Sequence, residues 1–171
     1  MNPIPSDTVI PAAAGPALLD RIAGCIRWSS HALDRLSPAV SLLFRLWIAA
    51  IFWQAGLTKI ASWDATLYLF SYEYSVPLLP PELAAYLGTG VELLMPALLA
   101  LGLATRFSAL TLFLFNIVAV ISYPELNEIG LKDHQYWGLM LLVPLFYGPG
   151  ALSLDALIGP YLAPKRRLAH H

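Results

Sequence analysis

Residues 82–123 read ELAAYLGTGVELLMPALLALGLATRFSALTLFLFNIVAVISY, and this stretch decides the fold. It consists of two apolar runs, residues 82–103 and residues 105–123, which meet at a short turn around Arg106. An α-helix rises 1.5 Å per residue, so a run of about 20 apolar residues crosses a hydrocarbon core of ~30 Å. The sequence therefore predicts two membrane-spanning helices joined as a tight antiparallel hairpin.

The composition of the whole chain agrees with a membrane protein. The 171 residues are 58% hydrophobic and 12% charged, with a net charge of −1, whereas soluble domains carry roughly 25% charged residues. This balance argues against disorder, a coiled coil or an ordinary cytosolic enzyme. Nucleic-acid binding is not expected either, because no basic stripe is present to neutralise phosphates. The single cysteine, Cys25, excludes an internal disulfide and a cysteine-based zinc site, and we expect no metal site.

Two further spans are predicted on either side of the hairpin. The first runs over residues 38–59, with Ser37 as its N-cap and Pro38 at the first helical position. The last runs over residues 132–147; it is short and requires local thinning of the bilayer or a shielded polar first turn. The aromatic linker 60–81 is predicted to form a short interfacial helix or lid. Together these elements predict an all-α, integral membrane four-helix bundle.

The membrane domain, residues 37–158, is flanked by segments of different character. Residues 1–16 contain four prolines and are predicted to be a flexible cytoplasmic tail. Residues 17–36 have helical periodicity with one apolar and one charged face, which predicts an amphipathic helix at the membrane surface or, alternatively, against a partner protein. Residues 159–171 form a basic cytoplasmic tail, in which His170 and His171 resemble the start of a purification tag and are left out of any metal argument.

The distribution of lysine and arginine predicts the orientation. The side of the membrane that holds both termini carries seven such residues, and the other side carries Lys59 and Lys132. The seven are Arg21, Arg27, Arg35, Arg106, Lys165, Arg166 and Arg167. By the positive-inside rule, we expect a multi-pass membrane protein with both termini in the cytoplasm. We expect its partners to be the bilayer and membrane or periplasmic proteins, further copies of the chain included.

Charged residues within the spans are expensive and therefore informative. Arg45 and Glu92 are predicted to lie at similar depths, which favours an intramembrane ion pair between them. Such a pair has two interpretations: it staples two helices, or it forms the polar end of a ligand site. Asn116, His134 and Trp53 are further ligand-binding candidates, although an asparagine within a span also serves as an interhelical hydrogen-bond residue. No residue is predicted to be catalytic.

Several motifs together resemble the DoxX family of small bacterial membrane proteins with four spans. The similarity extends over roughly residues 42–158. The motifs are Arg45-Leu46, Gly56-Leu57-Thr58-Lys59-Ile60, Glu92-Leu93-Leu94, Leu101-Gly102-Leu103-Ala104-Thr105-Arg106, Asn116 and Gly148-Pro149-Gly150-Ala151-Leu152-Ser153-Leu154-Asp155. The linker from Trp63 to Glu82 and the sequence around His134 look like the subgroup associated with maturation of small copper-binding peptides.

The resemblance implies a helical membrane bundle and a connection to redox chemistry. Some members are described as membrane subunits of quinone-linked sulfur oxidation, and others as parts of oxidative-stress complexes. Arg45, Glu92 and Asn116 match family positions and transfer as site candidates. From the resemblance we therefore expect a protein of the bacterial inner membrane that binds a lipophilic ligand of the quinone class. It would serve as an accessory subunit of a redox or peptide-maturation complex. The alternative is a non-catalytic membrane anchor or assembly factor that recruits partner proteins.

Overall fold

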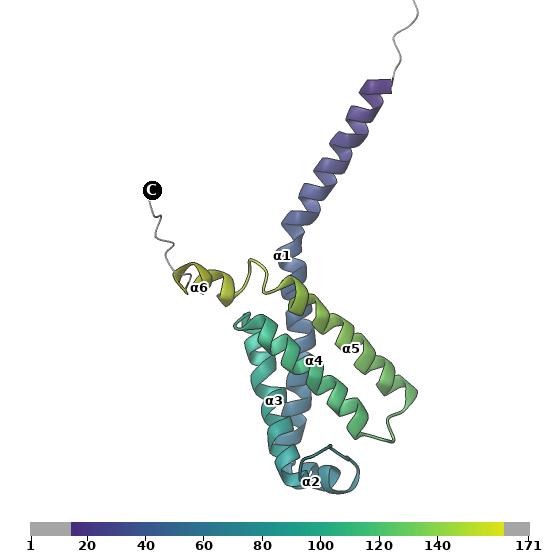
Figure 1. Ribbon diagram of the computed structural model, residues 1–171, viewed down its shortest axis with the longest axis vertical. Coiled ribbons are helices and arrows are strands. Elements are labelled where there is room, and N and C mark those ends of the chain that lie inside the picture. The colour runs from purple at the N-terminus through teal and green to yellow at the C-terminus, as the bar shows by residue number, and fades with distance from the viewer. Residues whose placement is uncertain (1–14, 163–171) are drawn as a thin grey trace, which may run out of the picture. The chain divides into compact units, whose positions relative to one another are not determined.

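The computed structural model describes residues 15–162, and these are almost entirely helical (Figure 1). Six helices follow one another, and no strand occurs between residues 15 and 162. They are α1 (Gly15–Ala61), α2 (Trp63–Tyr72), α3 (Pro81–Leu101), α4 (Thr105–Ser122), α5 (Glu128–Tyr147) and α6 (Leu154–Leu162). The all-α fold class is confirmed. The predicted tail 1–16 lies outside the described residues except for its last two, and so does the basic tail after residue 162.

Three of the described helices are long and apolar enough to cross a membrane. They are residues Asp20–Ala61 of α1, Pro81–Leu101 (α3) and Thr105–Ser122 (α4). Helix α5 has 20 residues, but its first turns carry Glu128, Lys132 and Asp133, so only its second half is strongly apolar. The fourth predicted span therefore remains a prediction. The other three predicted spans each lie within a helix that is long and apolar enough to cross a membrane.

The predicted helix start at Ser37 is wrong, because α1 continues from Gly15 through Pro38 to Ala61. A proline inside a helix removes one backbone hydrogen bond to the residue four positions earlier, and the neighbouring bonds can carry the helix past it. The chain nevertheless divides into two compact units at this point, Met1–Leu36 and Ser37–His171. In the described part of the first unit, Ile22, Ile26 and Leu33 are exposed, as an amphipathic surface helix requires.

The hairpin predicted from residues 82–123 is present, with α3 and α4 joined by a three-residue turn, 102–104. Helix α3 ends in a left-handed Gly102 at φ +69°. The amides of Gly102 and Leu103 donate back to the carbonyls of Leu99 and Leu98 at 3.1 and 2.9 Å, which is the Schellman arrangement. Glycine adopts this backbone conformation without steric cost, so the chain reverses immediately.

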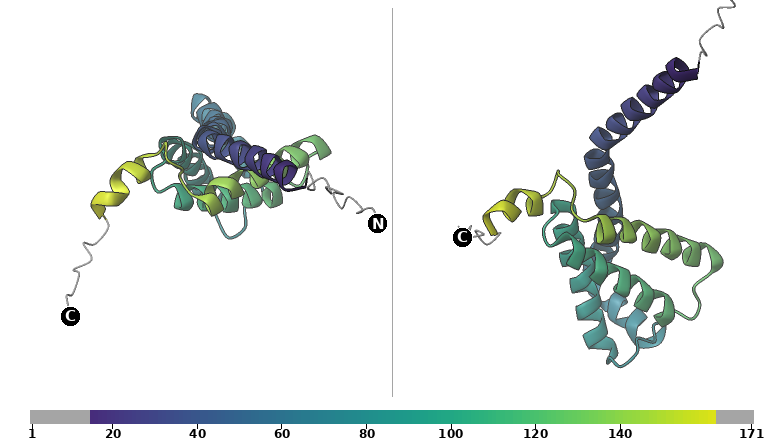
Figure 2. Two further views of the ribbon diagram at one scale, coloured as in Figure 1. Left: turned by 90° about the horizontal axis from the view of Figure 1, so that it is seen from above. Right: turned by 45° about the horizontal axis from the view of Figure 1, so that its top comes forward.

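The core of the second unit lies where α1, α3, α4 and α5 meet, and α4 and α5 run side by side (Figure 2). Its buried side chains are Ile48, Phe52, Met95, Leu99, Ala109, Leu112 and Leu141. A second cluster, Phe70, Ala84 and Ala85, joins α2 to the start of α3. The linker 60–81 was expected to form a short interfacial helix or lid, and it contains the helix α2, which packs against the start of α3.

Candidate functional site

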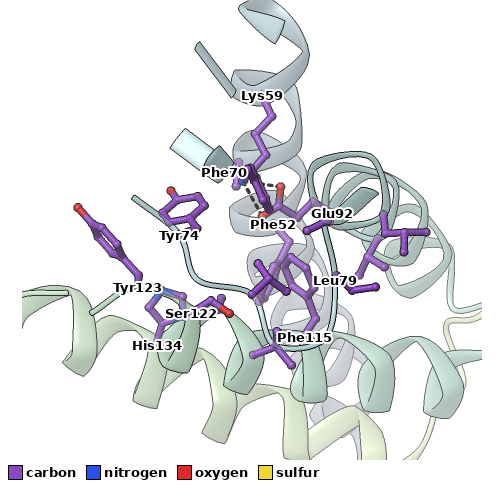
Figure 3. Close-up of a pocket in the computed structure, with 18 of the residues that line it drawn as sticks. Phe52, Lys59, Phe70, Tyr74, Leu79, Glu92, Phe115, Ser122, Tyr123 and His134 are labelled. Carbon is purple, nitrogen blue, oxygen red and sulfur yellow. Dashed lines mark hydrogen bonds and ion pairs between the residues drawn. The ribbon is translucent and has the colours of Figure 1, made fainter. Parts of the chain in front are cut away.

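A pocket of about 400 Å³ lies beneath α2 and the segment that follows it (Figure 3). Its walls are mainly apolar and come from α1 to α5 and from the segment 73–80. Among them are Phe52, Phe70, Leu79, Val91, Phe115 and Trp137. Six polar side chains lie among these walls, namely Lys59, Tyr74, Glu92, Ser122, Tyr123 and His134. A cavity of this size with few polar groups is typical of a small-molecule site.

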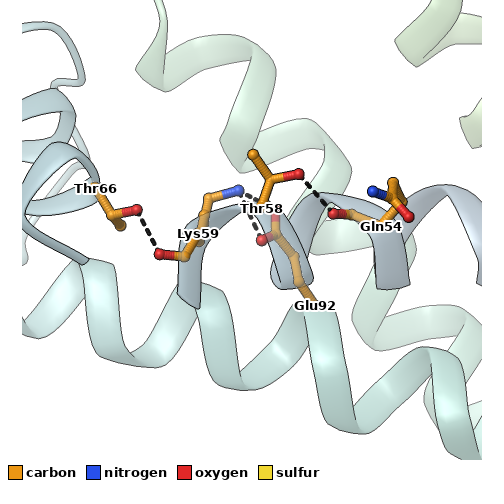
Figure 4. Close-up of polar contacts among 5 residues, drawn as sticks. All are labelled: Gln54, Thr58, Lys59, Thr66 and Glu92. Atoms are coloured by element: carbon orange, nitrogen blue, oxygen red, sulfur yellow. Dashed lines mark hydrogen bonds and ion pairs between the residues drawn. The ribbon is translucent and has the colours of Figure 1, made fainter. Parts of the chain in front are cut away.

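The charged end of the pocket is an ion pair between Lys59 and Glu92 (Figure 4). The ammonium Nζ of Lys59 donates to Glu92 Oε1 at 2.8 Å and lies 2.7 Å from Oε2. The two side chains are 19% and 7% exposed, respectively. A carboxylate is costly in a span unless it is paired, so Lys59 is the group that makes Glu92 tolerable there.

Gly56 brings α1 close enough to α3 for this pair to form. A Cβ at Gly56 would lie 2.8 Å from Leu93 Cδ2 and 3.2 Å from the carbonyl carbon of Glu92. Only glycine permits this approach. One turn further along α1, Lys59 therefore faces Glu92. The carbonyl of Lys59 also accepts a hydrogen bond from Thr66 Oγ1 at 2.8 Å (Figure 4), which fastens α2 to the end of α1.

Aromatic side chains from α2, from the segment after it and from the end of α4 form the cover of the pocket. The rings of Phe70 and Tyr74 meet edge to face with centroids 5.0 Å apart, and Tyr74 meets Tyr123 in the same way at 5.3 Å. The amide of Ser75 donates to the carbonyl of Ser122 at 2.7 Å, so the cover is tied to the end of α4. Burial, together with the nearby Tyr123, Glu73 and Glu92, raises the pKa of the Tyr74 hydroxyl, which is therefore neutral at physiological pH.

The polar groups on the α4–α5 side are Ser122 and His134. The hydroxyl of Ser122 is buried and has no hydrogen-bond partner among the described residues. Asn116 does not line the pocket; its Nδ2 donates to the carbonyl of His134 at 2.9 Å, and its Oδ1 lies 2.7 Å from His134 Nδ1. Asn116 is thus an interhelical hydrogen-bond residue that acts on the pocket through His134.

The predicted ion pair between Arg45 and Glu92 is wrong, since Glu92 pairs with Lys59. The error comes from the relative positions of the helices. Gly56 lies opposite Glu92, and Arg45 lies eleven residues before Gly56, about 16 Å along α1 at 1.5 Å per residue. Arg45 instead reaches the α3–α4 turn, where a Cβ on Gly102 would lie 2.0 Å from its Nη1.

Arg45 belongs to a structural cluster that we call the clasp, made of Arg45, Gly102, Leu152 and Asp155. The fully buried guanidinium of Arg45 donates from Nη2 to the carbonyl of Leu152. The amide of Asp155 donates to the carbonyl of Gly102 at 2.9 Å. The Asp155 carboxylate accepts from the amides of Ala104 and Thr105 at 2.8 and 2.9 Å, which caps the start of α4. Arg45 does not line the pocket beneath α2, and its contacts join the ends of the helices.

The predicted ligand-binding residues therefore divide into those that line the pocket and those that lie elsewhere. Glu92 and His134 line the pocket as the sequence indicated, whereas Arg45 does not. Trp53 is 40% exposed and borders a shallow groove with Pro96 and Leu46, outside the pocket.

Sequence reasoning missed Lys59, Tyr74, Ser122 and Tyr123 as residues of the pocket. A signal for Lys59 existed, because it follows Arg45, Phe52 and Gly56 on one face of α1 at helical spacing. The two tyrosines and Ser122 left no comparable signal, since their roles depend on how the segment 73–80 folds over the end of α4.

The sequence matches one family model and is similar to a known bacterial protein. The family model for DoxX matches residues 40–124. A protein of Haemophilus influenzae, described as an uncharacterized protein, is 32% identical over 136 residues, which cover 74% of this chain and 88% of that protein. No solved structure matches the chain.

Proposed function

We propose that this chain, which belongs to the DoxX family of membrane proteins, binds a lipophilic molecule of the quinone class in the pocket beneath α2. In this proposal it serves as an accessory subunit of a redox or peptide-maturation complex. The pocket itself carries the proposal: it has a volume of about 400 Å³, and it is walled by apolar side chains between helices that enter the membrane. A lipophilic ligand can reach such a site from the bilayer.

The polar groups of the pocket suit a flat ring that bears oxygen atoms. The Lys59 ammonium is a donor, the Glu92 carboxylate is an acceptor, and the unpaired Ser122 hydroxyl can be either. Aromatic side chains, among them Phe52, Phe115 and Trp137, supply surfaces on which a ring can pack. Unpaired polar groups are costly in hydrocarbon, so a ligand that forms a hydrogen bond with the Ser122 hydroxyl binds more tightly.

A substitution that fills the pocket tests this proposal. Ala119 lines the pocket, so Ala119→Phe projects a ring into it. Ile117, on the same helix, is 44% exposed and does not line the pocket, so Ile117→Phe is the matched control. In nanodiscs, we expect decylubiquinone to quench tryptophan fluorescence saturably in the unsubstituted protein. Ala119→Phe should weaken binding at least about tenfold, and Ile117→Phe should leave it unchanged.

Two further observations complete this test. Lipophilic molecules that co-purify with the protein, identified by mass spectrometry, should be depleted from Ala119→Phe and retained by the control. If no probe binds saturably, or if Ala119→Phe binds as well as the control, the pocket is not a ligand site.

The alternative function, a membrane anchor or assembly factor, is favoured by one observation. The described part of the first unit exposes Ile22, Ile26 and Leu33 on a helix that carries several arginines, a pattern that suits a membrane surface or a partner protein. A chain truncated before Ser37 separates the two functions. Ligand binding survives this truncation if the pocket is sufficient, and association with a partner complex is lost if the first unit recruits it.

We propose that both termini are cytoplasmic and that the pocket opens toward the periplasmic side of the inner membrane. The excess of lysine and arginine on the terminal side supports this orientation. In a Cys25→Ser background, a cysteine at Glu125, beside the pocket, should react with an impermeant thiol reagent in intact spheroplasts. A cysteine at Ala151, in the loop of the clasp, should react only after permeabilisation. The reverse pattern would invert the orientation, and labelling of both positions from one side would rule it out.

A further inference from the structure

The amide of Asn116 can have only one orientation. Its Nδ2 lies 2.9 Å from the backbone carbonyl oxygen of His134, which can only accept a hydrogen bond. The NH₂ group must therefore face that carbonyl, and the amide oxygen must face the ring nitrogen Nδ1, 2.7 Å away.

This orientation determines the tautomer of His134. An amide oxygen can only accept, so Nδ1 of His134 must carry a hydrogen and donate it to Asn116. A neutral imidazole carries one such hydrogen, and its other nitrogen, Nε2, is then an acceptor. Among the residues that the structure describes, no group donates to Nε2. The ring is also held in place by an edge-to-face contact with Trp137, at a centroid distance of 4.7 Å.

His134 lines the pocket on the side of Ser122 and Tyr123, opposite the Lys59–Glu92 pair (Figure 3). In that view the hydroxyl end of Tyr123 points away from His134. The ammonium of Lys59 is engaged by Glu92 on the other side of the pocket. Since Nδ1 is engaged by Asn116, which does not line the pocket, Nε2 is the ring nitrogen that His134 has left for a ligand in the pocket that it lines.

From this arrangement we propose that the pocket selects ligands whose ring carries a hydroxyl group, a phenol or hydroquinol, because that hydroxyl donates to His134 Nε2. Asn116 is then a positioning residue that fixes His134 as an acceptor. If the ring has only a carbonyl or ether oxygen near His134, that oxygen and Nε2 are both acceptors and cannot form a hydrogen bond, so the ligand binds more weakly. The inference rests on the proposed function, since it requires that the pocket take a lipophilic ligand.

A matched pair of probes tests the selection. Para-octylphenol and para-octylanisole have the same chain and ring, but the methyl ether of the anisole cannot donate. We expect the unsubstituted, full-length protein, in phosphatidylcholine nanodiscs at about pH 8, to bind the phenol about tenfold more tightly than the ether. That pH lies above the usual histidine pKa of about 6.5, so the ring is studied in its neutral form. Isothermal titration calorimetry measures both affinities.

Substitutions of His134 and Asn116, with one of His31 as the control, identify the residue responsible. His134→Leu should reduce the affinity for the phenol to that for the ether and leave the ether unchanged. His31→Leu, a histidine on the exposed part of α1 in the first unit, should change neither. Asn116→Leu should decrease the ratio of the affinity for the phenol to that for the ether, because the imidazole of His134 is then free to adopt the other tautomer.

Nitrogen-15 NMR of labelled histidine gives a readout that does not depend on these variants folding. We expect Nε2 of His134 to show the signal of an unprotonated nitrogen, and this signal to shift when the phenol is added but not when the ether is added. A protonated Nε2, or equal affinities for the two probes, overturns the selection while leaving ligand binding intact. If neither probe binds, the proposed function fails as well.

Discussion

The two ends of the membrane domain each bury a charged side chain, and they use it differently. At the clasp, Arg45 is fully buried and donates to a backbone carbonyl in a tightly packed site. At the other end, Glu92 is 5% exposed, pairs with Lys59 and borders a cavity of about 400 Å³. A buried charge in a membrane span therefore does not by itself indicate a ligand site. The adjacent space distinguishes the two cases.

The lengths of the chain connections explain the difference. At the clasp, the turn 102–104 and the loop 148–153 are short, and their backbone groups pack directly around Arg45. At the pocket, α1 and α3 are joined through α2 and the segment 73–80. This longer connection lies over the helix ends, and its aromatic side chains leave a cavity beneath them.

Among the substitutions that test this comparison, Gly102→Ala should change the free energy of unfolding most. A Cβ there would lie 2.0 Å from Arg45 Nη1 and 2.5 Å from Ser153 Cβ, on a backbone at φ +69°. Strain and overlap together should cost about 4 kcal/mol, measured by equilibrium unfolding in mixed detergent micelles. Gly90→Ala, where a Cβ meets nothing within 4 Å, is the control and should be neutral or slightly stabilising. A tolerant Gly102→Ala would show that the clasp is not tightly packed.

Breaking the ion pair at the pocket should have the next largest effect. Lys59→Met or Glu92→Leu alone leaves an unpaired charge and should cost about 3 kcal/mol, at the low end of the range for buried pairs, because Lys59 keeps 19% of its side chain exposed. The double variant should recover most of that loss. As a contrast, Arg45→Met combined with Glu92→Leu should be additive, because these two residues lie at different ends of the helices. Coupling of Glu92 to Arg45 and not to Lys59 would contradict the structure.

Loss of the α4 cap should have the smallest effect and a characteristic pH dependence. Burial opposes ionisation of Asp155, but hydrogen bonds from Thr105 and Ala104 outweigh it and hold the pKa of this carboxyl below its usual value. Its contribution is therefore complete above the unfolded-state pKa of about 4 and is lost as the pH falls through the lower folded-state pKa. Asp155→Ala should cost about 1 kcal/mol at neutral pH.

The same pH series contains the control for this prediction. The difference between Asp155→Ala and the unsubstituted protein should shrink as the pH falls below about 4. Glu125→Ala, an exposed carboxylate in the loop between α4 and α5, should match the unsubstituted protein throughout. A difference that persists unchanged in acid would mean that Asp155 does not act as an ionised cap.

Local patterns predicted the helices well and their ends less well. The α3–α4 hairpin, the helix within 60–81 and the end of α5 before Gly148 follow from hydropathy and from glycine and proline positions. The start of α1 did not, because Pro38 is compatible both with a helix start and with a helix interior. Backbone hydrogen bonds on both sides of the proline decided between the two.

The sequence by itself determined that this is a helical membrane protein and where three of its long apolar helices lie, because hydropathy and helical periodicity are properties of the segments themselves. The tertiary structure alone decided that Glu92 pairs with Lys59, that Arg45 joins the clasp, and that a pocket opens beneath α2. These results depend on how far α1 is shifted along α3. That shift is set by the contact of Gly56 with Leu93 and by the closure of both ends of the helices, which no single segment encodes.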